Sequence, residues 1–313
     1  GANEAPPAII SVYLGERLTE TLQQVEAGVF EEYRTRARQV KVGVATTPNF
    51  EGDDSDRNRT SPFAFTGNKF EFRACGSSQS CSEFNTYLNV AVAESLDYIS
   101  DQLESFRDSE SFGDHLQLLL ADLLRKHKRI VYNGNNYSQR WLEEAKRRGL
   151  PNLTTALEAL TPLLNINNHK LMERYGIFSS IEMESRYEIY SEEYLRKIQI
   201  EGEVLCEIAQ NMILPVALEA YNNCLNSISQ AQQVGVDSGC GCLRELAGVI
   251  GKNVDALFDL VAKLSSFTKM DTDSCQTYVQ MTKSLRLVID TLEEYVDDSK
   301  WPLPKYREML FVL

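Results

Sequence analysis

The densest group of regularly spaced charged side chains lies at residues 69–73, which read Lys-Phe-Glu-Phe-Arg. Successive side chains of a strand point to opposite faces, so Lys69, Glu71 and Arg73 are predicted to share one face. A carboxylate between two cations could bind a divalent metal ion beside an arginine that binds a carboxylate or phosphate through two parallel hydrogen bonds. The same spacing is typical of a solvated charge ladder, which the spacing by itself favours.

Two more candidate residues lie upstream. Arg59 belongs to the run Asp-Arg-Asn-Arg-Thr at 56–60 and could neutralise a phosphoryl group as charge develops on its oxygens. A loop arginine that faces solvent is the simpler interpretation. Glu4 precedes Pro6 and Pro7, which stiffen the chain and could present its carboxylate at a fixed angle as a proton acceptor. Composition alone favours a frayed acidic terminus there.

Other motifs favour structural roles. The basic cluster at 125–129 follows an apolar run, and cations at a helix C-terminal end stabilise the helix dipole, so we prefer that role to a phosphate or nucleic-acid site. Cys240 and Cys242 lack a second cysteine pair or a nearby histidine, which argues against a zinc site. Residues 235–241 predict a flexible connection rather than a phosphate-binding loop.

Composition narrows the class of partner. The 313 residues include 32 Lys and Arg against 45 Asp and Glu, for a net charge of −13 at pH 7. This charge argues against nucleic acid or an anionic membrane as the principal partner. No continuous apolar run approaches the roughly 18 residues of a membrane span. Seven cysteines, an odd and scattered set, predict reduced thiols and a cytosol-like compartment.

The elements that would position these residues change in type along the chain. Strands are expected at 8–13 and 69–73, a helix near 15–39 and an acidic loop at 52–56, whereas helical signals dominate from residue 82 onward. The segment 12–55 receives no functional role. The sequence therefore predicts an α+β fold.

Three amphipathic helices are predicted in the second half. A capping-box pattern at 179–182 opens the first, whose apolar stripe runs from Tyr187 to Met212, and Pro215 should kink or interrupt it. Further stripes at steps of three and four residues run from Leu243 to Leu264 and from Tyr278 to Tyr295. Such stripes can pack as a bundle.

These pieces, in this order, resemble the C-terminal portion of glutamine synthetase in its long type III form. Residues 1–11 resemble the mobile flap and the strand that follows it, 58–62 the Asn-Arg-Ser/Thr phosphate motif, and 69–73 the Arg/Lys-x-Glu-x-Arg strand. Further segments resemble the type III C-terminal extension: 132–138, 176–178, 184–188 and 301–306. The resemblance spans essentially the whole chain.

The resemblance implies ATP-dependent condensation of glutamate with ammonia through γ-glutamyl phosphate. It implies that Glu4 is the flap carboxylate that shields the intermediate and takes a proton from ammonium, and that Arg59 contacts ATP phosphate. Glu71 would be a ligand of Mg²⁺ (or Mn²⁺), and Arg73 would face glutamate and the transferring phosphoryl group. Other classes of the family carry a second arginine five residues after the phosphate motif, where Ala64 stands here, and Lys69 would supply part of that missing positive charge.

The resemblance also implies a division of the chain. Residues 1–110 would form the C-terminal part of the catalytic β-sheet domain, and 111–313 a helical extension. The remaining metal carboxylates would precede Gly1, so we expect the chain alone to lack synthetase turnover. The full protein would be a double-ringed homo-oligomer in the cytoplasm, or in an organelle if a targeting segment lies upstream. The rival hypothesis is a non-catalytic helical assembly or scaffold module, in which the charged strand has no chemical role.

Overall fold

The computed structural model describes residues 9–28, 39–40, 50–51, 59–73 and 80–310. These residues are mostly helical and include a small three-stranded sheet, in agreement with the predicted mixture of helix and strand. The chain divides into two compact units, named here the N-terminal unit (Ala5–Glu184) and the C-terminal unit (Ser185–Leu313). The compact units therefore separate far from residue 110, and the functional boundary placed there stays a prediction.

Short strands build the sheet of the N-terminal unit. They are β1 (Val12–Tyr13), β4 (Phe63–Phe65) and β5 (Phe70–Phe72), in the order β1-β4-β5, while β2 (Gln39–Val40) and β3 (Phe50–Glu51) form a separate antiparallel pair. β1 pairs with β4 in parallel, and β4 pairs with β5 in antiparallel register, so that Ala64 lies opposite Glu71. The connection between β4 and β5 is tight: the Thr66 amide donates to the Lys69 carbonyl at 2.9 Å, and Gly67 has a φ of +91° that favours glycine.

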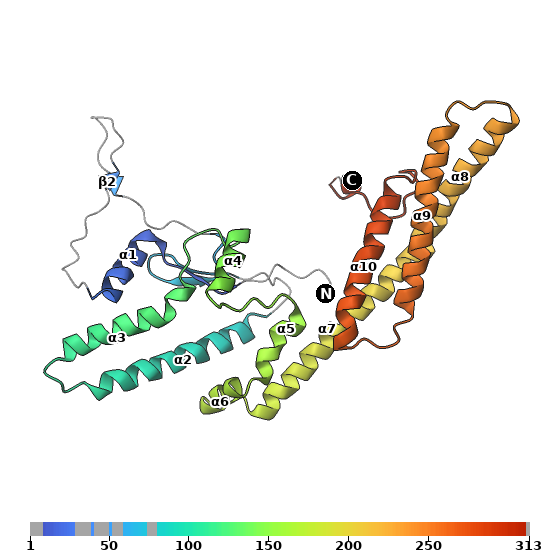
Figure 1. Ribbon diagram of the computed structural model, residues 1–313. Helices are drawn as coiled ribbons and strands as arrows, with labels where there is room; N and C mark the ends of the chain where they lie inside the picture. Colours follow the sequence, from blue (N-terminus) through green and yellow to red (C-terminus); the bar gives the residue numbers. More distant parts are fainter. Residues whose placement is uncertain (1–8, 29–38, 41–49, 52–58, 74–79, 311–313) are drawn as a thin grey trace. The chain divides into compact units, whose positions relative to one another are not determined.

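Helices make up most of the other residues that the structure describes in the N-terminal unit (Figure 1). They are α1 (Gly15–Glu26), α2 (Ser82–Ser105), α3 (Phe112–His127), α4 (Gln139–Arg147), α5 (Ala156–Leu160) and α6 (Ile166–Arg174), with the short 3-10 turns η1 (Lys128–Ile130) and η2 (Thr161–Leu164). The expected helix over 15–39 is corrected, because α1 ends at Glu26 and Gly28 adopts a φ of +75°. A left-handed glycine just beyond a helix ends it without steric cost.

A small apolar core lies next to β1. Ile9, Trp141, Ala145 and Leu150 are buried together, and the Trp141 ring stacks on Tyr132 with ring centroids 4.1 Å apart. The same segment extends the sheet edge, since the Tyr132 amide donates to the Val12 carbonyl at 3.0 Å. Residues that follow α3 are thereby fixed beside β1.

The first long helix begins where the capping pattern predicts. The Glu182 carboxylate accepts from the Ser179 amide at 2.8 Å, and the Glu182 amide donates to Ser179 Oγ at 3.3 Å, so the reciprocal capping box is confirmed. The helix comprises α7 (Ser180–Ile208), a π-helical turn η3 (Ala209–Ile213) and α8 (Leu214–Gln233). Pro215 lies at the start of α8, and the π-helical turn directly before it confirms the predicted interruption, because proline cannot donate the hydrogen bond of a regular helix.

The buried stripe of this helix matches the predicted one in part, since Ile198 is buried as predicted. The prediction followed the largest apolar side chains, including Met212, which is exposed. Toward the end of the stripe the buried positions lie one residue further along, at Cys206, Ala209 and Ile213, and the small side chain of Ala209 allows a close approach of the neighbouring helices. Gly202 shows the same principle, since a Cβ there would clash with the Tyr278 ring.

The C-terminal unit is a helical bundle. Helix α8 packs along α9 (Cys240–Ser265), and α9 packs along α10 (Thr272–Glu293); Figure 1 shows the three side by side. A short helix, α11 (Tyr306–Leu310), follows. The predicted stripes are confirmed at Ile250 and Leu257 of α9 and at Leu285 and Leu292 of α10, all of which are fully buried.

One helix bears on membrane association. The continuous helical stretch Ser180–Gln233 is long and apolar enough to cross a membrane by length and composition, which corrects the expectation that no segment approaches such a span. The core helix of a water-soluble protein can satisfy the same criterion, so this stretch assigns no location to the protein.

Candidate functional site

The charged face of β5 is built as the alternation predicts. Arg73 forms an ion pair with Glu71 at 3.1 Å, and Lys69 approaches the same carboxylate at 3.6 Å. Exposed side-chain fractions fall from 65% for Lys69 to 39% for Glu71 and 26% for Arg73. The hydrogen bond from Arg73, followed by the charges of Lys69 and Arg73, lowers the pKa of Glu71 below its ordinary value, so this carboxylate is ionised at neutral pH.

Phenylalanine rings hold the opposite face of this hairpin in place. Phe63 stacks on Phe70 with ring centroids 5.3 Å apart, and Phe72 stacks on Phe84 of α2 at 3.5 Å. Aromatic pairs of this kind contribute beyond their buried area. The charged face therefore has a fixed backbone, because the ring face anchors β5 to β4 and to α2.

The turn that carries Arg59 joins the same hairpin. The Arg73 amide donates to the Pro62 carbonyl at 2.8 Å, which extends the β4–β5 ladder by one bond. Ser61 is almost fully buried, and its hydroxyl donates to the Phe63 carbonyl at 2.9 Å. Arg59 itself is exposed. The structure thus brings Arg59, Lys69, Glu71 and Arg73 onto one hairpin and its entering turn, whereas Glu4 lies outside the described residues.

Asparagines after α3 hold this region from the other side. Asn133 Oδ1 accepts from the Leu14 and Gly15 amides, both at 3.2 Å, at the start of α1. The Asn136 amide donates to Thr60 Oγ1 at 3.0 Å, and Asn136 Nδ2 donates to Ser11 Oγ at 2.5 Å. Sequence reasoning missed these roles. The only available signal was the density of asparagines in the turn at 133–136, and asparagine side chains commonly bind backbone groups in turns.

The sequence of this chain is similar to those of known proteins. Residues 115–232 match the family model described as the glutamine synthetase C-terminal domain. The whole chain is 36% identical over 327 residues to the type-3 glutamine synthetase of Dictyostelium discoideum, covering 44% of that protein. Residues along 99% of the chain align at 34% identity with the glutamine synthetase of Bacteroides fragilis (strain YCH46), of which they cover 45%. The chain is similar to the C-terminal portion of type-3 glutamine synthetase.

A third relative extends this result. The glutamine synthetase of Butyrivibrio fibrisolvens is 33% identical over 324 residues, which cover all of the chain and 46% of the relative. The chain therefore spans slightly less than half the length of the glutamine synthetases that it matches. The match to the glutamine synthetase C-terminal domain begins in α3 and ends in α8, so it includes parts of both compact units.

Ala64 lies across from Glu71 on the charged face of the hairpin. It pairs with Glu71 across the strands, so the two side chains share a face, and Ala64 is 1% exposed. This buried position in β4, between β1 and β5, holds only a methyl group, so the cations that the structure describes beside Glu71 are Lys69 and Arg73.

A metal ion bound at Glu71 would need further ligands besides this carboxylate. Among the residues that the structure describes, no group of three or more His, Cys, Asp or Glu side chains is arranged to hold a metal ion. Glu71 fits a hard cation chemically, because it is an ionised oxygen donor, yet a single carboxylate supplies only part of a coordination sphere. The described hairpin can therefore provide one ligand of a metal site.

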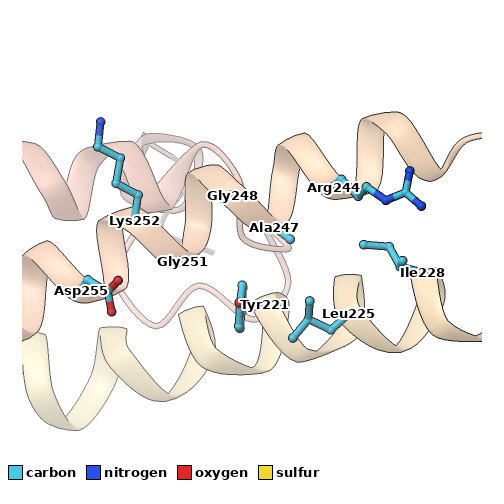
Figure 2. A pocket seen from close by; sticks show the side chains of 9 residues that line it. All are labelled: Tyr221, Leu225, Ile228, Arg244, Ala247, Gly248, Gly251, Lys252 and Asp255. Carbon is cyan, nitrogen blue, oxygen red and sulfur yellow. The ribbon is translucent and has the colours of Figure 1, made fainter.

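Cavities in the C-terminal unit involve other residues. One of about 540 Å³ lies between α8 and α9, and Figure 2 shows Tyr221 of α8 facing Gly248 and Gly251 of α9. A Cβ on Gly251 would come within 3.1 Å of the Tyr221 ring, so this groove reflects close helix packing. A second cavity of about 290 Å³ adjoins Cys206 and Tyr278, and burial raises the pKa of Tyr278 to about 12. Neither cavity includes the charged residues of β5.

The remaining sequence motifs have structural roles. The basic cluster follows the predicted pattern: α3 ends at His127, Lys126 pairs with Asp122 at 2.7 Å, and Lys128 pairs with Glu26 at 2.6 Å. Cys240 is buried in α9, and its thiol contacts the Val236 carbonyl oxygen at 3.5 Å.

Proposed function

We propose that this chain contributes to the active site of an ATP-dependent ligase that condenses L-glutamate with ammonia through γ-glutamyl phosphate. The observation that carries the proposal is the charged hairpin, on which Glu71 and Arg73 form an ion pair and which the turn of Arg59 enters, in a chain similar along its whole length to proteins named glutamine synthetase. ATP, glutamate and ammonia are the proposed substrates, with Mg²⁺ or Mn²⁺ as the proposed metal.

Each charged residue has a role suited to its position. Glu71 supplies one carboxylate ligand to the metal, and its ion pairs with Arg73 and Lys69 keep it ionised. Arg73 faces glutamate and the transferring phosphoryl group. Arg59 contacts the phosphates of ATP from the turn that enters β4. Lys69 adds positive charge at the exposed end of the strand.

Physical chemistry supports this set of roles. Phosphoryl transfer requires mainly positioning and neutralisation of the charge on the phosphoryl oxygens, which arginines held on a stiff hairpin provide. Glu71 would hold the metal ion through its carboxylate, and the ion would supply positive charge that neutralises phosphate oxygens. Glu4, on the proposed flap, would exclude water from the acyl phosphate and accept a proton from ammonium.

Replacement of Glu71 tests the proposal. In the natural full-length protein, Glu71→Gln should reduce ATP-dependent γ-glutamyl hydroxamate formation by at least about 100-fold, because the neutral amide is a poor metal ligand. Glu110→Gln is a matched control, since Glu110 is exposed on the loop before α3. Full turnover by Glu71→Gln, with the metal requirement unchanged, would remove Glu71 from the metal site.

We further propose that the full protein assembles as a homo-oligomer. Exposed apolar side chains on α7 support self-association: Ile189, Ile200 and Val204 are 58%, 51% and 47% exposed. Light scattering after size-exclusion chromatography should give a mass of several chains, and a monomer at micromolar concentration would contradict this. The rival scaffold hypothesis also predicts assembly, so assembly does not distinguish the two hypotheses. Full synthetase activity in Glu71→Gln and Arg73→Gln would favour the scaffold hypothesis, because the charged strand would then have no chemical role.

A further inference from the structure

We propose that Asn136 is a positioning residue that sets the place of the Arg59 turn in the active site. This inference rests on the proposed function, because it assigns a role to Asn136 only if Arg59 contacts the phosphates of ATP. Asn136 belongs to the part of the chain that matches the glutamine synthetase C-terminal domain, whereas Arg59 precedes that part.

Asn136 bridges two segments that are distant in sequence. Its amide donates to Thr60 Oγ1 at 3.0 Å, and its side-chain Nδ2 donates to Ser11 Oγ at 2.5 Å. Ser11 is completely buried at the start of β1, so it offers a rigid point of attachment. Through Asn136, the residue next to Arg59 is therefore tied to the beginning of the sheet.

The segment that carries Asn136 is itself fixed at both ends. On one side, Asn133 accepts hydrogen bonds from the first amides of α1. On the other side, Ser138 caps α4 by accepting from the Trp141 amide at 3.3 Å, and Trp141 is buried. A bridge with two fixed ends can restrain the turn, because movement of Thr60 would require movement of α1 or α4 as well.

A separate hydrogen bond holds the turn at Pro62, next to β4. Pro62 is bonded to the Arg73 amide, so the β4–β5 ladder holds Pro62 whether or not the Asn136 bridge is present. Loss of the bridge should leave Arg73 and Glu71 in place and release only the segment that precedes Pro62. Loss of the bridge is therefore expected to change the KM for ATP without a matching change in the KM for glutamate.

The side-chain carbonyl of Asn136 indicates a geometric role. Asn136 Oδ1 is buried and has no hydrogen-bond partner among the described residues. A buried acceptor without a partner is destabilising, so the residue is not an optimum for stability alone. The side-chain Nδ2, which donates to Ser11 Oγ, provides the benefit that accounts for an asparagine at this position, whereas the bond to Thr60 comes from the backbone amide.

Two variants of Thr60 test the bridge with minimal change of volume. Thr60→Val replaces the accepting hydroxyl by a methyl group, whereas Thr60→Ser retains it. In the natural full-length protein, Thr60→Val should raise the KM for ATP about 10-fold and leave the KM for glutamate within about twofold, because small displacements of a positioning group reduce productive binding. Asn136→Ala keeps the backbone amide that donates to Thr60 and removes only the bond to Ser11, so it should raise the KM for ATP by a smaller factor. Thr60→Ser should restore the KM for ATP, and Asn89→Ala, an exposed asparagine of α2, should change neither constant.

Hydrogen exchange tests the bridge without any substrate. The Asn136 amide should exchange at least about 10-fold faster in Thr60→Val than in Thr60→Ser, because only the valine variant removes its acceptor. Equal exchange rates, or equal increases in both KM values, would overturn the inference. If Glu71→Gln keeps full activity while Thr60→Val accelerates exchange, the proposed function has failed and the bridge has not; the reverse pattern rejects the bridge alone.

Discussion

The two compact units are stabilised by different kinds of contact. In the C-terminal unit, α8, α9 and α10 bury apolar stripes, and Ile250, Leu257 and Leu285 are inaccessible to solvent. In the N-terminal unit, the sheet has strands of two or three residues, and hydrogen bonds that Asn133 accepts and Asn136 donates hold distant segments beside it. The difference shows that a continuous apolar stripe can specify a bundle, whereas a short-stranded sheet depends on individual polar contacts in addition to its aromatic and apolar ones.

The largest expected effect tests the apolar core of the bundle. Leu257→Ala should lower the free energy of unfolding by about 3 kcal/mol, because it removes buried methyl groups and leaves a cavity in α9. Phe258→Ala, at the next position, should change it by less than about 0.5 kcal/mol, since Phe258 is 64% exposed. Urea denaturation measures both. Equal losses in the two variants would show that the stripe does not define the core.

An intermediate effect is expected from the polar contacts of the N-terminal unit. Asn133→Ala removes the acceptor for the Leu14 and Gly15 amides and should destabilise α1 by about 1 kcal/mol, the usual cost of losing a helix cap. Hydrogen exchange along α1 measures this loss. Asn222→Ala, at an exposed position of α8, is the control. If both variants leave α1 exchange unchanged, the polar contacts are not what stabilises this unit.

The smallest expected effect concerns the titration of Glu71. Its folded-state pKa lies below the ordinary value of 4.5, mainly because of the hydrogen bond from Arg73. The associated stabilisation is therefore complete above the unfolded-state pKa and is lost as the pH falls through the folded-state pKa. Arg73→Gln should raise the pKa of Glu71 toward 4.5, as followed by NMR titration of the carboxyl group. An unchanged pKa would show that the ion pair does not form in solution.

Sequence periodicity predicted the elements whose contacts are local or repetitive. The stripe from Leu243 to Leu264 predicted α9, the pattern at 179–182 predicted the start of α7, and Pro215 predicted the interruption before α8. The alternation at 69–73 predicted the shared face of Lys69, Glu71 and Arg73. Each of these features depends on residues within a few positions of one another, so local geometry is sufficient to infer it.

Local patterns were insufficient where packing selects among several apolar residues. Met212 is larger and more apolar than Ala209, yet Ala209 is the buried residue, because the close approach of neighbouring helices favours a small side chain there. The family resemblance proposed roles for Arg59 and Glu71, but it contained no information on which segment holds the turn at Thr60.

By itself, the sequence determined the helical character of the second half, the pairing of charges along one strand and the capping of the long helix. Only the tertiary structure decided that β1 lies parallel to β4, that Asn136 reaches both Thr60 and Ser11, and that the compact units separate within α7. The physical reason is distance along the chain: residues 76 and 125 positions apart leave no periodic signal, and only the folded backbone brings their polar groups within bonding range.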